Sequence, residues 1–246
     1  MPDPNIRKLS RNENIPRPYV IKPPLERKTL YLKDELIKYE MVIFGRAIDF
    51  LPYILITLKS AAQNGLGKNR GRAYLERIHQ KNPVTGNVHE LFSSENDMVY
   101  PRDIFFTEND FKTMDVDRVR LNFKTPAVIK DRGKFIQTPA FDTLIKRIRD
   151  RFSALSWFYE GIEPDIDFKN FTVEAEKVKT VRADVAYMQT YRRTRNPSAK
   201  QNMSGFVGSL IYQGPISQYM PYLLFGQYMH VGKAAVFGNG WYEAEV

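Results

Sequence analysis

Two stretches far apart in the sequence repeat one order of elements: a short apolar helix with an early proline, a basic glycine-rich loop, and a strand. The helices open with residues 51–55 (LPYIL) and 220–224 (MPYLL). Proline is tolerated there because the first N–H groups of a helix have no partner within it. A repeated unit of this kind predicts two related domains. Chance likeness between short apolar helices is the alternative.

The second glycine-rich loop, residues 230–240 (HVGKAAVFGNG), is the more distinctive of the two. Glycine lets backbone N–H groups approach an anion without an intervening Cβ, and Lys233 adds a positive charge, so the loop favours phosphate. It fits neither nucleotide fingerprint, because no Ser or Thr follows Lys233 and the glycines come after a helix. A plain turn with a glycine helix cap is the alternative interpretation.

The pattern of elements predicts an α+β fold of tandem ferredoxin-like (RAMP/RRM-like) domains. Residues 113–246 contain strand 118–129, a helix from Thr138 to about residue 155, strands 171–189 and 204–213, a helix capped by Ser217, and strand 241–246. This β-α-β-β-α-β order makes a C-terminal domain with the glycine-rich loop. Residues 19–112 supply β-β-α-β, an N-terminal domain lacking its opening strand and helix. Residues 1–18 form an extended segment.

The composition of the chain favours some classes of function and excludes others. Lys and Arg number 37 against 28 Asp and Glu, a formal charge of +9, which favours a nucleic acid or another polyanion as partner. A merely basic protein is the alternative. The absence of cysteine excludes disulfides and thiol catalysis, and three scattered histidines make a metal site or other cofactor unexpected. The short apolar runs and polar start predict a cytoplasmic protein without a membrane partner.

Four pieces of the sequence resemble one family. They are Phe44-Gly45, residues 64–70 (NGLGKNR), residues 204–208 (SGFVG), and the loop from His230 to Gly240. With these pieces the chain resembles the CRISPR-associated endoribonucleases that process precursor guide RNA, the Cas6 family of the RAMP superfamily. The resemblance implies tandem ferredoxin-like domains, binding of CRISPR repeat RNA, and cleavage without metal through attack of the RNA's own 2′-OH, giving a 2′,3′-cyclic phosphate.

The implied chemistry needs a base, an acid and donors for the charged phosphorane. His230 and Lys233 are the candidate catalytic residues, and Gly232, Gly238 and Gly240 join Lys233 as candidate phosphate-binding residues. His230 can equally be a helix cap or a packing residue. The catalytic histidine of many family members belongs to the first helix of the N-terminal domain, which this chain lacks, and His79 and His89 are expected to be incidental. An active nuclease and a shortened RNA-binding member both remain open.

Two basic clusters are the predicted RNA-binding residues, and solubility is the alternative reason for their charge. They are Lys68, Arg70 and Arg72 on the first glycine loop, and Arg192, Arg193, Arg195 and Lys200 at a hairpin tip. The rival function is a non-catalytic RNA-binding RAMP subunit of a CRISPR effector complex. Effector-complex subunits and a second copy of the chain are therefore further candidate partners.

Overall fold

The computed structural model describes residues 15–26, 28, 30–67, 69–111, 114–194 and 200–246. The chain forms two compact units. We call the first, drawn from residues 1–45 and 112–246, the sheet unit, and the second, residues 46–111, the inserted unit. The inserted unit ends at Phe111.

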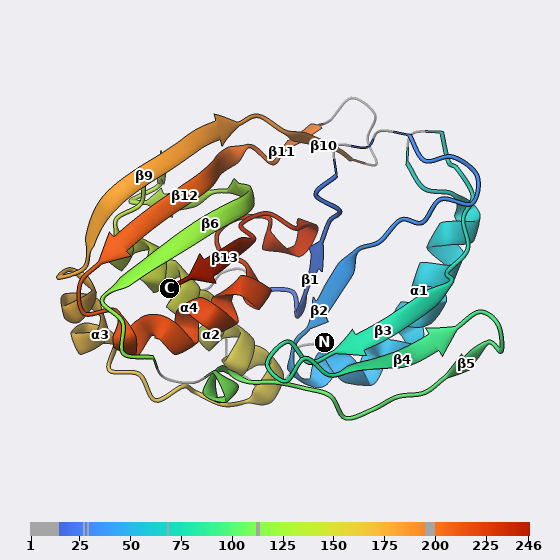
Figure 1. Ribbon diagram of the computed structural model, residues 1–246, viewed down its shortest axis with the longest axis horizontal. Coiled ribbons are helices and arrows are strands. Elements are labelled where there is room, and N and C mark those ends of the chain that lie inside the picture. The colour runs from blue at the N-terminus through green and yellow to red at the C-terminus, as the bar shows by residue number, and fades with distance from the viewer. Residues whose placement is uncertain (1–14, 27, 29, 68, 112–113, 195–199) are drawn as a thin grey trace. The chain divides into compact units, whose positions relative to one another are not determined.

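The sheet unit is built on a four-stranded antiparallel sheet (Figure 1). The spatial order is β13 (Tyr242–Glu245), β6 (Arg118–Ala127), β12 (Gly205–Gln213) and β9 (Lys179–Met188). With α2 (Phe141–Glu160) after β6 and α4 (Met220–Met229) after β12, this is the arrangement expected of a β-α-β-β-α-β ferredoxin-like unit. The predicted α+β class with antiparallel sheets is therefore observed.

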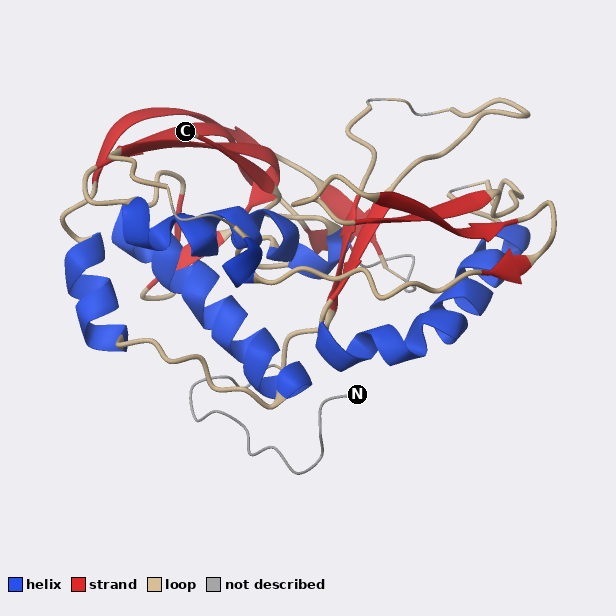
Figure 2. Cartoon of the chain, turned by 60° about the horizontal axis from the view of Figure 1, so that its bottom comes forward, coloured by secondary structure: helices blue, strands red, loops and turns tan. Residues whose placement is uncertain are grey.

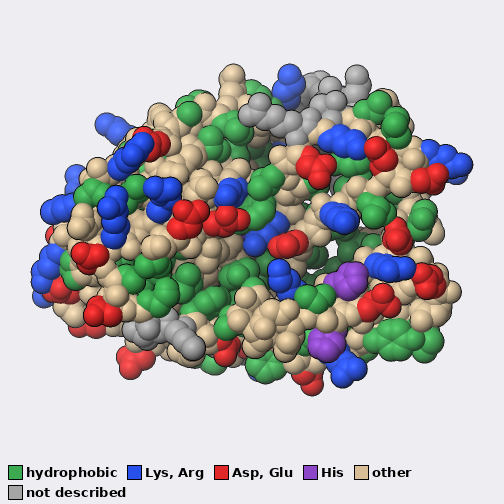
Figure 3. All heavy atoms as spheres, viewed as in Figure 1, with side chains coloured by type: hydrophobic (Ala, Val, Ile, Leu, Met, Phe, Trp, Pro, Cys, Tyr) green, Lys and Arg blue, Asp and Glu red, His purple; other side chains and the backbone are tan. Residues whose placement is uncertain are grey.

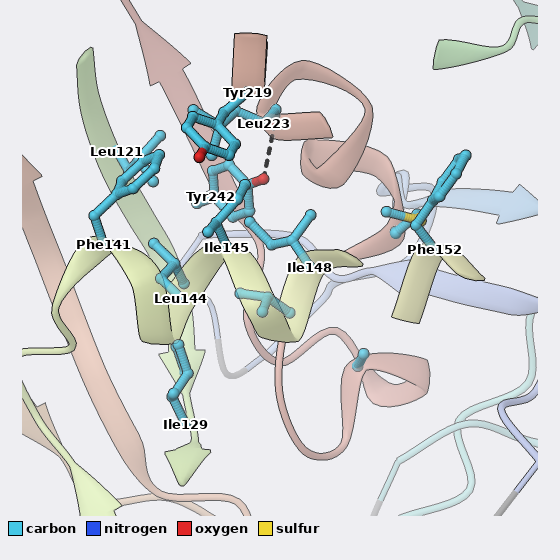
Figure 4. Close-up of a cluster of buried hydrophobic side chains, with 14 of the residues drawn as sticks. Leu121, Ile129, Phe141, Leu144, Ile145, Ile148, Phe152, Tyr219, Leu223 and Tyr242 are labelled. Carbon is cyan, nitrogen blue, oxygen red and sulfur yellow. Dashed lines mark hydrogen bonds between the residues drawn. The ribbon is translucent and has the colours of Figure 1, made fainter. Parts of the chain in front are cut away.

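Helices α2 and α4 lie on one face of this sheet (Figure 2). The apolar stripe predicted for α2 is buried: Phe141, Leu144, Ile145 and Ile148 are fully enclosed. They point toward Leu121 of β6 and Tyr242 of β13 (Figure 4), whose hydroxyl donates to the carbonyl of Leu223 at 2.8 Å. Burial of these side chains, each stabilising by about 1.5–3 kcal/mol, holds α2 and α4 to the sheet.

The long strand predicted for residues 171–189 is wrong in its first half. Residues Phe168–Ala175 form helix α3, and β9 begins only at Lys179. The Asp167 carboxylate caps α3 by accepting from the N–H groups of Lys169 and Asn170, each at 3.1 Å. Phe171 and Ala175, four residues apart, are the buried pair of this helix. A helical spacing was thus mistaken for an alternating one.

The structure also corrects the assignment of residues 19–45 to the N-terminal domain. Strands β1 (Tyr19–Lys22) and β2 (Glu40–Ile43) pair antiparallel, yet they belong to the sheet unit. Val20 is fully buried in the same core as α2 and α4, and β1 contacts both α4 and the short helix η4 (Ala235–Phe237) of the glycine-rich loop. Hydrophobic burial, which sequence order does not reveal, decides where this hairpin packs.

The inserted unit contains a helix and a three-stranded antiparallel sheet. The 3₁₀ helix η1 (Gly45–Phe50) leads into α1 (Leu51–Asn64), which is followed by β3 (Arg77–Lys81), β4 (Val88–Ser93), β5 (Met98–Val99) and the 3₁₀ turn η2 (Glu108–Asp110). The order β1, β2, α1, β3 is the β-β-α-β predicted for this half. Leu55, Leu91 and Phe92 are among its buried side chains.

Two small hairpins complete the sheet unit. They are β7 (Ile129–Asp131) with β8 (Lys134–Ile136), and β10 (Tyr191–Arg193) with β11 (Lys200–Asn202); the 3₁₀ turn η3 (Ser217–Tyr219) precedes α4. The Ser217 hydroxyl, predicted to cap a helix, instead accepts from the N–H of Val116 at 3.0 Å. Across the described residues, none of the helices has the length and apolarity needed to span a membrane.

Candidate functional site

The glycine-rich loop is bound tightly to the end of β6. The N–H groups of Lys233 and Gly240 donate to the carbonyls of Val128 and Pro126 at 3.2 and 3.0 Å, and the Thr125 hydroxyl donates to the carbonyl of Gly238 at 2.6 Å. At its two ends the loop closes on itself, because the N–H of Val231 donates to the carbonyl of Gly240 at 3.0 Å. The loop is therefore a fixed feature of the sheet unit.

Close packing explains two of the predicted phosphate-binding glycines. A Cβ on Gly240 would stand 1.8 Å from the carbonyl oxygen of Val231, and one on Gly238 would stand 2.6 Å from a ring carbon of Pro23. The N–H groups of both glycines are used inside the chain, donating to Pro126 and Ala235. Both N–H groups are thus already engaged within the chain, and close packing is a sufficient reason for glycine at each position.

The N–H of Gly232 and the side-chain ammonium of Lys233 are not engaged by any described residue. Gly232 has a φ of +87°, and its N–H makes no hydrogen bond to any described residue. The Lys233 side chain is exposed, and it forms no ion pair within the described part of the chain. An N–H and an ammonium next to each other in the sequence are the donors that a phosphate group requires.

His230, the other predicted catalytic residue, is fully buried. It follows the last residue of α4, and its ring is stacked on Trp241 with 6.2 Å between centroids and 5° between planes. Neither ring nitrogen makes a hydrogen bond of normal geometry to a described residue. The structure therefore favours the packing interpretation over a catalytic one, because an enclosed ring cannot reach a substrate.

The surroundings of His230 keep its ring neutral. Burial, together with the charges of Lys22 and Arg151 and opposed in part by the backbone of Asn239, lowers the pKa of His230 to about 3. Lys22 lies with its ammonium 4.9 Å from the Trp241 ring centroid. An imidazole with so low a pKa cannot serve as general acid near neutral pH.

Arg151 of α2 is a basic residue that points into the protein. Its guanidinium is enclosed, and its Nε donates to the carbonyl of Met229 at 2.8 Å. Burial lowers the pKa of Arg151 to about 10. Its neighbour Phe152 is buried, so Arg151 stands at the border of the apolar stripe, where periodicity does not separate the two environments.

The β10–β11 hairpin contacts the glycine-rich loop, and the sequence analysis did not predict this contact. The Arg192 guanidinium of β10 lies 3.9 Å from the centroid of the Phe237 ring, and the buried Asn239 donates to the carbonyl of Met203 at 2.8 Å. Arg192 and Lys200 remain exposed. Arg193 is part of β10, and Arg195 lies outside the described residues. Arg192 of the predicted hairpin cluster thus contacts the loop that carries Lys233.

The first basic loop is built differently. Leu66 and Gly71 exchange two backbone hydrogen bonds of 2.8 and 3.0 Å, which closes a tight turn in the inserted unit. Arg70, with a φ of 48°, and Arg72 are exposed on or beside this turn, and Lys68 lies outside the described residues. Lys and Arg side chains are spread over the visible face, with acidic side chains among them (Figure 3).

Comparison with known families and structures gives two family matches. Residues 121–242 match the model of the CRISPR-associated endoribonuclease Cas6, and residues 1–104 match a model described as an N-terminal domain. No curated protein sequence matches the chain.

Solved Cas6 structures resemble the chain over nearly its whole length. Cas6 (TTHA0078) in a product complex has a TM-score of 0.55 at 16% identity, covering 96% of this chain and 84% of that one. Cas6 (TTHB231) of Thermus thermophilus, also in a product complex, has a TM-score of 0.58 at 13% identity, covering 94% and 83%. A partial Cas6-RT-Cas1–Cas2 complex has a TM-score of 0.52 at 14% identity, with 92% of this chain and 38% of that chain covered.

At these identities the structural likeness shows the fold, and it confirms the predicted fold class. The resemblance drawn from the sequence is confirmed by the family model, which runs from within β6 to the first residue of β13 and includes the whole glycine-rich loop. Through residues 121–242, the chain belongs to the endoribonuclease family of the CRISPR-associated Cas6.

Proposed function

We propose that the chain binds CRISPR repeat RNA on the surface formed by the β10–β11 hairpin and the glycine-rich loop, and that it cuts precursor guide RNA there. The contact between Arg192 and Phe237 carries this proposal, because it brings the hairpin's exposed basic side chains to the loop that bears Lys233. Exposed arginine and lysine beside a loop with an unused N–H suit a phosphate backbone. Membership of a CRISPR RNA-processing family agrees with this substrate.

The proposed reaction is an internal transfer. The 2′-oxygen of the RNA attacks the adjacent phosphorus, the bond to the 5′-oxygen of the next nucleotide breaks, and a 2′,3′-cyclic phosphate and a 5′-OH result. A base takes the 2′-OH proton and an acid gives one to the leaving oxygen. The nucleophile comes from the RNA, so the reaction as proposed proceeds without a metal ion.

Within this reaction Lys233 stabilises the charge that develops on the phosphorane, with the N–H of Gly232 as a second donor. His230 holds the loop in place rather than moving a proton. His79 of β3 and His89 of β4, both exposed, are the other two histidines of the chain. Individual His79→Ala and His89→Ala variants test each for proton transfer through the pH profile of cleavage.

The experiment is cleavage of labelled repeat RNA by the purified chain in EDTA, compared between the unaltered protein and Lys233→Ala. Lys134→Ala is the control, because Lys134 is an exposed lysine at the β7–β8 turn of the same unit. Loss of a phosphorane donor lowers the rate about 100-fold or more. Equal rates for Lys233→Ala and the control would contradict the role of Lys233, and activity that requires an added divalent ion would contradict the reaction.

A non-catalytic RNA-binding subunit of a CRISPR effector complex is the second candidate. The burial of His230 favours it, since the one histidine of the loop is not available for chemistry. Tight binding of repeat RNA without any cleavage would support this candidate. One structural relative belongs to a partial Cas6-RT-Cas1–Cas2 complex, so co-purification with Cas1 and Cas2 subunits is the matching observation.

A further inference from the structure

The β7–β8 hairpin packs one of its faces on the protein and leaves the other outward. Ile129 and Ile136 are opposite each other in its ladder, and Ile129 is fully buried in the core of the sheet unit. Lys130 and Phe135 are the next opposed pair, so the alternation of side chains places both on the outward face. Arg147 of α2 donates to the carbonyl of Lys130 at 2.8 and 3.1 Å. The outward pair is therefore held in a fixed place.

An exposed pair of aromatic rings joins this hairpin to β9. The ring centroids of Phe135 and Tyr187 lie 5.8 Å apart, and the rings meet edge to face at 73°. Phe135 is 38% exposed and Tyr187 is 51% exposed, so each ring keeps uncovered surface. Aromatic rings at a protein surface are what unpaired nucleic-acid bases stack on. We call Lys130, Phe135 and Tyr187 together the stacking platform.

The charge beside the rings suits a nucleic acid. Lys130 and Arg132 are exposed, and neither forms an ion pair within the part of the chain that the structure describes. Arg132 and Gly133 form the turn with φ of +46° and +82°, and the first position of such a turn usually holds Asn, Asp or Gly. An arginine departs from this preference and places a second positive charge at the hairpin tip.

The stacking platform adjoins both parts of the proposed RNA-binding surface. Val128, two residues before Lys130, accepts from the N–H of Lys233 at 3.2 Å. Tyr187 lies five residues before Arg192, and β9 leads into the β10–β11 hairpin (Figure 1). The reach of an extended chain limits these two Cα separations to about 7 and 18 Å. One RNA strand can therefore contact the glycine-rich loop and the stacking platform together.

We propose that Phe135 and Tyr187 stack unpaired bases of the RNA that the glycine-rich loop holds, while Lys130 contacts a phosphate of the same strand. The ligand is single-stranded RNA of any sequence, because every base has a face on which an aromatic ring can stack. This inference rests on the proposed function, since it adds a second subsite for the same RNA.

Binding of a short labelled oligoadenylate tests the stacking directly. Phe135→Leu and Tyr187→Leu remove a ring and keep an apolar side chain, and each is expected to weaken binding at least about fivefold. Phe168→Leu is the matched control, because Phe168 of α3 is 45% exposed in the same unit, and its binding is expected to stay unchanged. Circular dichroism confirms that each variant is folded.

An abasic strand of the same length separates base stacking from other effects. It keeps the phosphates and loses the bases, so all the variants are expected to bind it equally. Equal binding of oligoadenylate by all the proteins would overturn the proposal and leave the aromatic pair as a surface for a protein partner. A loss of the same size with the abasic strand would overturn it as well.

Salt dependence tests the contact of Lys130. Lys130→Ala is expected to reduce the slope of log affinity against log salt by about 0.7, the value for one phosphate of a single strand. Lys134→Ala is the matched control, because Lys134 is opposed to Asp131 on the other face of the hairpin, and its slope is expected to stay unchanged. Equal slopes for the two variants would overturn this contact.

Cleavage distinguishes failure of this inference from failure of the proposed function. With repeat RNA that carries unpaired nucleotides on both sides of its folded part, Tyr187→Leu is expected to need at least about fivefold more protein for half-maximal cleavage, at an unchanged maximal rate. With RNA trimmed to the folded part and the cut, the variant and the unaltered protein should match. An equal effect on both RNAs would overturn the stacking platform. If the unaltered protein cuts neither RNA, the proposed function fails, and the oligoadenylate titration still decides this inference.

Discussion

At the scale of single residues, His230 shows how burial changes the role of a chemically capable side chain. It directly precedes the Val-Gly-Lys of a loop that reads as a phosphate site, yet its ring is enclosed and stacked on Trp241. Two cationic side chains, Lys22 and Arg151, act on it electrostatically. The result is a neutral packing residue whose titration is coupled to folding.

This coupling predicts that stability falls with acidity. The pKa of His230 is lowered from 6.5 to about 3 in the folded chain, so its contribution is complete above pH 6.5 and is lost as the pH falls from 6.5 toward 3. The unfolded chain takes up the proton first, giving a slope of up to ~1.4 kcal/mol per pH unit. Urea unfolding at pH 7.5, 5.5 and 4.5 measures it. His230→Phe keeps an aromatic ring and removes the titration; an unchanged slope in that variant would refute the assignment.

Lys200 and Arg192 are expected to contribute to RNA binding in different ways, Lys200 by its charge alone and Arg192 by a charge that the Phe237 ring holds in position. Lys200→Ala removes a phosphate contact and should reduce the slope of log affinity against log salt by about 0.7–0.9. Phe237→Leu removes the ring beneath Arg192 but no charge, so affinity should fall while the salt slope stays the same. Fluorescence titrations over about a sixfold range of salt concentration measure the affinity and the salt slope of each variant. A reduced slope for Phe237→Leu would contradict this expectation, because it would mean that Arg192 loses its phosphate contact when the ring is removed.

At the scale of elements, the glycine-rich loop was located from sequence, but the close packing of its glycines was not predicted. The pattern of residues 230–240 shows that the backbone adopts unusual angles, and Gly232, Gly238 and Gly240 do have positive φ. A glycine with positive φ can leave its N–H available to a ligand, or it can let another part of the chain pack closely against it. The residues that lie next to the loop decide between these two roles. Pro126 and Val128 at the end of β6, over 100 residues earlier, supply those contacts.

The packing role predicts unequal effects of one substitution. Gly240 and Gly133 have φ values of +71° and +82°, so alanine costs roughly 1–2 kcal/mol of backbone strain at either position. A Cβ at Gly133 meets nothing within 4 Å, whereas one at Gly240 collides with the carbonyl of Val231. Gly240→Ala should therefore destabilise the chain by at least about 2 kcal/mol more than Gly133→Ala. Equal melting temperatures for the two variants would contradict this account.

The remaining elements show where sequence patterns suffice. The face of α2 from Phe141 to Phe152 follows from its spacing alone and is buried as predicted. Helix α3 was missed because its cap, Asp167, is a single residue in a stretch with alternating apolar side chains. The contact between Arg192 and Phe237 joins residues 45 apart, and no local pattern indicates such a pair.

At the scale of the molecule, the sheet unit is discontinuous in sequence. Strands β1 and β2 precede the inserted unit, yet Val20 is buried with the helices of the later half, and Gly238 packs against Pro23. The order of elements along the chain did not indicate that residues 19–45 pack with the later half. The domain limits 19–112 and 113–246 therefore divide a single hydrophobic core.

A fragment of residues 112–246 should therefore be less stable than a fragment in which residues 15–45 are joined to it by a flexible linker. Loss of the fully buried Val20 and its neighbours leaves an apolar surface exposed beside α4 and the glycine-rich loop. Thermal unfolding followed by circular dichroism compares the two, and a difference of several degrees in Tm is expected. Identical Tm values would show that β1 and β2 do not stabilise the core.

The central claim is that the chain cuts repeat RNA by attack of the RNA's own 2′-OH. The most direct measurement is single-turnover cleavage of a repeat RNA with one 2′-deoxy nucleotide immediately before the cut, beside the all-ribose RNA. We predict complete loss of cleavage with binding unchanged, and a 2′,3′-cyclic phosphate on the all-ribose product. Cleavage of the deoxy substrate at the same position would contradict the account, because the nucleophile would then have to be water or a protein group.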